Sequence, residues 1–404
     1  MNLIVSKKEL WVPTELIDRI FKFIERDLGS YDYKGQWDLL ALLFVCKEWH
    51  DIAQRRLYSS VGIEGSQPLS LGGKNNVHGD NNAFFDLVKA KPHLASLVRE
   101  LRIGAFYQSI EEAATHARLV PLCTNIQRVV LAGNDRQFLA PLKSTLAQMD
   151  LIEFTLSHLG RRDKQSEETR SPADSELCTP SEIISYMLNW PRLRKFVAQT
   201  STRTYELGEE EALLPSVSAV EGRCPDLREI SLGDCTFSAK QLLLLSALTP
   251  NVRRANLSIQ ADATDALFTC LERWSSTLEH LSISSPNIES DSASTINIDP
   301  YPDLYELRSL TTSSQIIPPD MLATFIELES LEYTATTEHI EHLCDILHHI
   351  PSLPLLRKLQ LRPLTDFLVN MAEIPRTRAA VIALRGICNT RKIRFSDITY
   401  LFRD

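Results

Sequence analysis

The sequence predicts an α/β protein in which a small N-terminal group of three helices precedes a solenoid of repeated strand and helix units. The strands are expected to form a parallel sheet on the concave face, with helices and irregular segments on the convex face. Three observations support this: an amphipathic stretch at 11–24, an apolar pattern that recurs along most of the chain, and helix-like segments between its copies. The chain has 404 residues, 44% of them hydrophobic, which is enough for a large core.

The first predicted helix lies in the stretch WVPTELIDRIFKFI. Pro13 suits a helix start, and Glu15 in the first turn suits the positive end of the helix dipole. Two further helices are expected near 37–45 and 48–58. Three helices in about 50 residues make a small core. The apolar face of the first helix exceeds what they bury and is expected to be a partner surface. Its apolar residues are Leu16, Ile17, Ile20, Phe21 and Ile24.

The rest of the chain repeats a unit with an apolar residue, a second three positions later and a third five positions later. The copies begin at 98, 126, 151, 193, 227, 252, 278, 304, 328, 356 and 390, the last being weak. Most intervals between successive copies are close to the repeat length of leucine-rich repeats, which is about 20–29 residues. The units also resemble the L-x-x-L-x-L pattern of that repeat. Because such a unit cannot bury its own face, it must stack on its neighbours.

The segments between the strand units carry helix signals. Thr179 with Glu182, and Ser238 with Gln241, have the spacing of capping boxes. A third segment keeps Ile340, Leu343, Leu347 and Ile350 on one stripe. Its histidines, His339, His342 and His349, are interpreted as a solvated polar face rather than a metal site.

Composition places the domain boundaries. A Gly- and Asn-rich segment at 62–84 is expected to be a linker between a helical domain at 1–61 and about eleven repeats at 85–404. Two longer intervals hold polar insertions at 160–178 and 284–303.

The N-terminal stretch resembles the F-box motif as it occurs in fungal F-box proteins. That motif runs Leu-Pro-x-Glu-Leu, an apolar helix, Val-Cys-Lys/Arg-x-Trp and a final Leu-Tyr. The matching positions here are Pro13, Glu15, Leu16, Ile20, Val45, Cys46, Lys47, Trp49, Leu57 and Tyr58, with Val12 in place of the usual leucine. The resemblance covers about 50 residues, and a following repeat array is a common layout in that family.

The resemblance implies a substrate receptor of a cullin–RING ubiquitin ligase. The partner of the N-terminal helices would be a Skp-type adaptor and, through it, a cullin. The repeats would hold a protein substrate. The adaptor-binding residues are then expected to be Val12, Pro13, Leu16, Ile20, Val45 and Trp49. Two alternatives stay open: the helices cap the solenoid, or the chain is an interaction scaffold with no role in ubiquitination.

The remaining sequence features argue against other functions. No catalytic or phosphate-loop motif is present, so neither an enzyme nor a cofactor is predicted. The net charge of −9 does not suggest nucleic-acid binding, and no apolar run is long enough for a membrane span. Eight scattered cysteines fit reduced thiols in the cytoplasm or nucleus. Cys46 is expected to be a small core residue.

A basic cluster is predicted in the last two repeats. Alternation places Lys358, Gln360 and Arg362 on the concave face, with Lys392, Arg394 and Ser396 in the matching positions of the next strand. The cations among them, Lys358, Arg362, Lys392 and Arg394, are candidates for binding an acidic or phosphorylated segment of the substrate. The alternative is ordinary surface charge that keeps the repeats soluble.

Overall fold

The computed structural model describes ten stretches of the chain: 13–26, 40–64, 81–104, 110–132, 139–157, 179–199, 214–285, 302–349, 352–363 and 374–397. They fall into two compact units, Met1–Phe138 and Leu139–Asp404, each described by itself below. The predicted insertions at 160–178 and 284–303 lie almost entirely outside the described residues.

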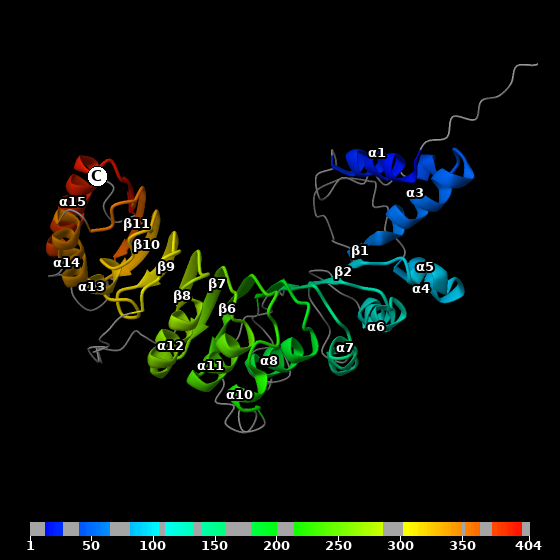
Figure 1. Cartoon of the computed structure of the whole chain (residues 1–404), viewed down its shortest axis with the longest axis horizontal. Helices are drawn as coiled ribbons and strands as arrows, with labels where there is room; N and C mark the ends of the chain where they lie inside the picture. Colours follow the sequence, from blue (N-terminus) through cyan, green and yellow to red (C-terminus); the bar gives the residue numbers. More distant parts are fainter. Residues whose placement is uncertain are drawn as a thin grey trace, which may run out of the picture. The chain divides into compact units, whose positions relative to one another are not determined.

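Unit 1 combines helices with three parallel strands (Figure 1). Its helices are α1 (Thr14–Arg26), α3 (Lys47–Ser59), α4 (Asn81–Ala90), α5 (Pro92–Ala95) and α6 (Ile110–Leu119), with a 3-10 turn η1 (Val120–Leu122). Its strands are β1 (Ser60–Glu64), β2 (Glu100–Gly104) and β3 (Arg128–Ala132). β1 follows α3 without a break and pairs with β2, so the predicted boundary at residue 61 falls inside a strand.

Unit 2 is a regular alternation of strand and helix. Its strands are β4 (Glu153–Ser157), β5 (Lys195–Gln199), β6 (Glu229–Phe237), β7 (Arg254–Ile259), β8 (His280–Ser284), β9 (Ser309–Ser313), β10 (Ser330–Ala335), β11 (Lys358–Pro363) and β12 (Arg394–Asp397). Each pairs in parallel with the next. The helices are α7 (Leu139–Leu146), α8 (Pro180–Asn189), α10 (Val217–Val220), α11 (Ala239–Leu248), η5 (Ala261–Ala263), α12 (Thr264–Trp274), α13 (Pro319–Leu322), α14 (Thr337–His348) and α15 (Ile374–Thr390).

The sheet of unit 2 has one covered face. Leu331, Tyr333 and Ala335 of β10 are fully buried, whereas the alternate residues Ser330 and Glu332 are half-buried. The helices lie on the covered face (Figure 1). The opposite face, called the open face below, carries the residues between the buried ones. The predicted α/β class, with a parallel sheet and helices, is confirmed.

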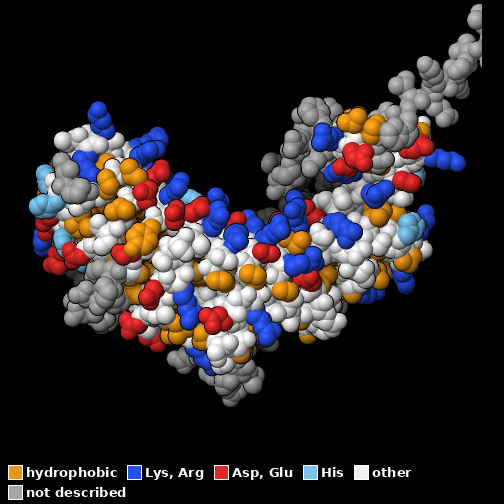
Figure 2. All heavy atoms as spheres, viewed as in Figure 1, with side chains coloured by type: hydrophobic (Ala, Val, Ile, Leu, Met, Phe, Trp, Pro, Cys, Tyr) orange, Lys and Arg blue, Asp and Glu red, His pale blue; other side chains and the backbone are white. Residues whose placement is uncertain are grey.

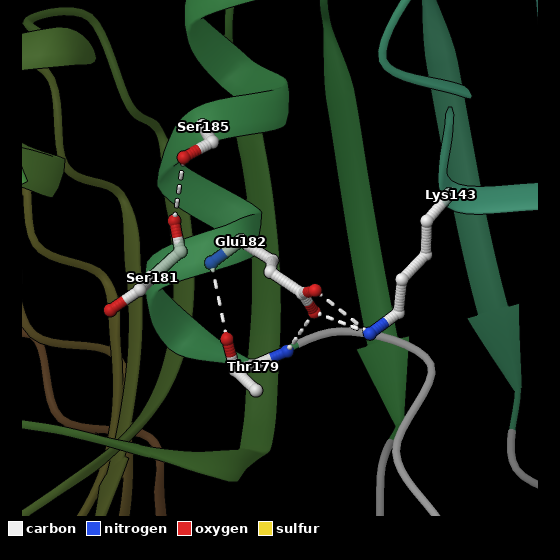
Figure 3. Close-up of polar contacts among 5 residues, drawn as sticks. All are labelled: Lys143, Thr179, Ser181, Glu182 and Ser185. Carbon is white, nitrogen blue, oxygen red and sulfur yellow. Dashed lines mark hydrogen bonds and ion pairs between the residues drawn. The ribbon is translucent and has the colours of Figure 1, made fainter. Parts of the chain in front are cut away.

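Both predicted capping boxes are present. Thr179 Oγ1 accepts a hydrogen bond from the Glu182 backbone N–H, and the Glu182 carboxylate accepts one from the Thr179 N–H. The Lys143 ammonium of α7 donates to both carboxylate oxygens of Glu182 at 2.8 Å (Figure 3). One side chain therefore starts α8 and ties it to the preceding helix. Ser238 and Gln241 make the second box, at the start of α11.

Neighbouring repeats are joined by buried polar side chains as well as by apolar packing. Trp190 Nε1 donates to the Leu146 carbonyl at the end of α7, and Trp274 Nε1 donates to the Thr249 carbonyl after α11. Both tryptophans are 0% exposed. Each indole thus fills the core and adds a hydrogen bond to a carbonyl at the end of the preceding helix region.

Two of the predicted repeat units were placed wrongly. The unit predicted at 304–309 begins instead at Leu307, because Leu310 and Thr312 are the buried residues of β9. The last unit is displaced by two residues: Lys358 is opposite Arg394, and Leu359 is opposite Phe395. In the first case, leucines three residues apart allow the same pattern to begin at either of two positions. In the second case, the weak last copy has no second leucine to fix its position.

Candidate functional site

The first helix, α1, begins where the sequence predicted. The Leu16 and Ile17 backbone N–H groups donate to the Pro13 carbonyl at 2.9 and 3.2 Å, which closes the first turn. The rest of the helix has two apolar sides. One side packs into the unit, and the other does not.

The packed side forms a small core with α3. Ile17, Phe21, Ile52 and Ala53 are buried together, and the Phe21 and Trp49 rings meet edge to face at a centroid distance of 5.4 Å. Leu42 and Leu43, from the turn before α3, also pack on this core.

An ion pair fixes α1 against α3. The Arg56 guanidinium donates to Asp18 Oδ1 from Nε at 2.9 Å and from Nη2 at 2.6 Å. The Arg56 side chain is 22% exposed, which keeps the contact partly shielded from water. The ion pair therefore holds helix α1 in one orientation on α3. In this orientation the second apolar side of α1 faces solvent.

The outer side of α1 remains exposed. Leu16 is 48% exposed and Ile20 is 45% exposed, and two residues just before α3 are more exposed still: Phe44 at 87% and Val45 at 57%. These four residues are called the outer apolar set below. Figure 2 shows apolar side chains gathered over α1. Large aliphatic and aromatic groups left in water are typical of a surface that meets another protein.

The predicted adaptor-binding residues do not all share this exposure. Leu16, Ile20 and Val45 belong to the outer apolar set, Pro13 is half-buried, and Val12 lies outside the described residues. Trp49 is half-buried because its ring packs on Phe21, so it supports the core as well as any outer surface. Sequence reasoning missed Phe44. Its signal was present, since it is a large aromatic directly before the Val-Cys step of the matched motif.

Cys46 is the N-cap residue of α3 and is exposed, so the expectation of a core position was wrong. Burial was inferred from its small size and apolar neighbours. The described core of these helices instead reaches no further than Leu43 on the turn before it.

The predicted basic cluster has a different geometry from the one expected. Lys392 precedes β12 in a turn with a positive φ of 59°, so it is not a strand residue. Arg394 takes its place opposite Lys358. Arg362 is paired with Glu332 of β10 at 2.6 Å. Asp397, in β12, pairs with Arg385 at 2.7 Å. Of the four predicted cations, Lys358 and Arg394 are therefore opposite each other, Arg362 is paired with a carboxylate, and Lys392 lies outside the strand.

The histidines of α14 have separate environments. His342 Nε2 lies 3.0 Å from Asp320 Oδ1 of α13. His339 contacts the Thr336 hydroxyl at 2.9 Å, and burial lowers the pKa of His339 below its ordinary value. Within the described residues, no group of three or more His, Cys, Asp or Glu side chains has the arrangement of a metal site.

No family model matches this chain, and no curated protein matches it at a significant level. Among the described residues, no helix combines the length and the apolar character needed to cross a membrane.

Proposed function

We propose that the chain is an F-box protein with leucine-rich repeats, acting as the substrate-recognition subunit of a Skp–cullin–F-box ubiquitin ligase. The helices α1 and α3 bind a Skp-type adaptor, which brings the cullin, and the repeats of unit 2 bind a protein substrate. The chain itself performs no chemistry and needs no cofactor. It raises the rate of ubiquitin transfer by holding the substrate near the loaded enzyme.

The observation that carries this proposal is the outer apolar set. Leu16 and Ile20 stay in water while Ile17 and Phe21 on the same helix are buried. The described residues leave this apolar side uncovered, at the motif positions that resemble an adaptor-binding surface, and an obligate partner would cover such a side. The regular strand–helix alternation of unit 2 supports the leucine-rich repeat part of the proposal.

The test is a titration of the purified full chain with a Skp-type adaptor. Changing both Leu16→Ala and Ile20→Ala is expected to weaken adaptor binding by about 2 kcal/mol or more, because apolar anchors at an interface centre dominate its free energy. Ile382→Ala is the matched control, since Ile382 is 57% exposed on α15 in unit 2. Unchanged affinity in the double variant would contradict the proposal.

The alternative is an interaction scaffold outside ubiquitination. Mass spectrometry of the endogenous complex separates the two. Adaptor together with cullin supports the ligase subunit, and adaptor without cullin supports the scaffold.

A further inference from the structure

The open face of unit 2 has a shallow trough across β6, β7, β8 and β9. Its volume is about 220 Å³. Its lining residues are Glu229, Ile230, Ser231, Arg254, Ala255, Asn256, His280, Leu281, Ser282, Ser309 and Thr311. Those on the open face come from the first and third positions of four successive strands, so they form two parallel rows.

The hollow has a simple cause in the sequence. One row consists of short polar side chains, Ser231, Asn256, Ser282 and Thr311. The next strand, β10, continues that row with the longer Glu332. Asn256 Nδ2 donates to Ser231 Oγ at 3.2 Å, which fixes the amide. Gly233 leaves the space for it, since a Cβ there would lie 2.9 Å from Asn256 Nδ2.

The other row carries the charge. It runs Glu229, Arg254, His280 and Ser309 across the four strands. Glu229 is held by Lys195 of β5, with Nζ and Oε1 2.8 Å apart. Arg254 is exposed and makes no ion pair among the described residues. Its neighbour Arg253, which does not line the trough, pairs with Glu279 at 3.3 Å.

These groups share one chemistry. A guanidinium offers a fork of N–H donors that matches the oxygens of a phosphate or a carboxylate. Serine and threonine hydroxyls and an imidazole beside it are further donors for the same oxygens. The donors converge on one hollow rather than lying along a flat surface.

We propose that this trough binds an anionic oxygen group, a phosphate or a carboxylate, on a side chain of the protein substrate. Arg254 supplies the charge, and His280, Ser282, Ser309 and Thr311 surround it. The inference rests on the proposed function for the identity of the ligand as a protein segment. It places the anion site in the middle of unit 2, away from the predicted cluster on β11 and β12, where Arg362 already has a carboxylate partner.

The experiment uses fluorescein-labelled nonapeptide pools with randomised flanks and a fixed central residue: phosphoserine, glutamate or serine. Anisotropy titrations of the purified full chain are expected to show that a phosphoserine or glutamate pool binds about tenfold more tightly than the serine pool, which corresponds to about 1.4 kcal/mol. The preferred pool tells whether the anion is a phosphate or a carboxylate. Equal affinity for all three pools would overturn the inference.

The variants locate the effect. Arg254→Glu is expected to abolish the preference for the anionic pools, and Arg254→Gln to reduce it, whereas Arg253→Glu is expected to retain it. An equal loss in the Arg253 and Arg254 variants would show general charge attraction and also overturn the inference. Adaptor affinity of all three variants is measured in parallel. If the chain binds the adaptor but does not distinguish the peptide pools, only the anion site is refuted. If it distinguishes the pools but does not bind the adaptor, the proposed function is refuted.

Discussion

Helices α1 and α11 are both rich in apolar residues, but their surroundings differ. In α11, Leu242, Leu244, Leu245 and Leu248 are fully buried because α8 and α10 lie on one side and α12 on the other. In α1, Leu16 and Ile20 face water, whereas Ile17 and Phe21 are buried. A repeat helix is covered by the next repeat, whereas α1 lacks such a neighbour among the described residues of its unit. The same residue type therefore stabilises the fold in one helix and is available to a partner in the other.

The largest expected difference between the two regions is in thiol chemistry. Burial raises the pKa of Cys224 to about 12. At pH 8 very little of this thiol is then the reactive thiolate. Cys46, which adjoins the outer apolar set, is exposed. Iodoacetamide at pH 8 is expected to label Cys46 orders of magnitude faster than Cys224, as measured by peptide mass spectrometry.

The labelling is run in a Cys178→Ser background, because Cys178 lies outside the described residues. Adding 6 M guanidinium chloride is the control, since it should bring the two rates together. The same assay reports on the proposed partner: a Skp-type adaptor is expected to slow the labelling of Cys46. Comparable rates for both thiols in the native chain would contradict the assigned burial.

A second prediction contrasts two aromatic side chains. Trp274→Ala is expected to destabilise unit 2 by about 3–5 kcal/mol, because it leaves a cavity and removes the donor to the Thr249 carbonyl. Phe44→Ala, at a residue 87% exposed, is expected to change the stability of the fold by no more than about 0.5 kcal/mol. Urea denaturation followed by circular dichroism measures both. A similar shift of the transition midpoint in the two variants would refute the comparison.

A third prediction concerns Glu182. Glu182→Ala removes both its hydrogen bond in the capping box and its ion pair with Lys143, and is expected to cost about 1 kcal/mol. Glu182→Gln keeps an acceptor for the Thr179 N–H but loses the charge, so it should destabilise the fold by only a few tenths of a kcal/mol. Thermal unfolding of the two variants gives the order, and an equal loss in both would assign the stability to the ion pair.

The sequence predicted the strands well because one buried pattern recurs with little variation. Ile230 and Leu232 occupy the expected core positions of β6, and Leu359 and Leu361 those of β11, while Leu227 and Leu356 are buried just before these strands. The capping boxes were found because their partners are three residues apart. Errors arose where the pattern was ambiguous, as at Leu304, Leu307 and Leu310.

The sites were harder to predict than the strands. The outer apolar set was found in part, since the surplus of apolar residues in a short segment is visible in the sequence. The trough was missed because each strand adds only one or two of its residues, about 25 residues apart along the chain. The pairing of Glu332 with Arg362 was missed for the same reason, since alternation within a strand says nothing about the side chain on the neighbouring strand. A comparison of the short polar residues at Ser231, Asn256 and Ser282 across the copies would have indicated the trough.

Four buried side-chain hydrogen bonds between repeats run from a later donor to an earlier carbonyl, whereas Cys344 Sγ donates forward to the Ala380 carbonyl. Trp190 and Trp274 donate to carbonyls of the helix region that comes before them, and the Cys224 and Cys270 thiols likewise donate to the earlier carbonyls of Met187 and Leu242. The Leu146 and Met187 carbonyls already accept the backbone N–H groups of Met149 and Trp190 in their own repeats. An indole N–H, in contrast, enters the core only when its acceptor is already in place. On the ribosome, where the N-terminal residues emerge first, each new repeat therefore meets a finished template. These four contacts therefore favour assembly in the order of synthesis.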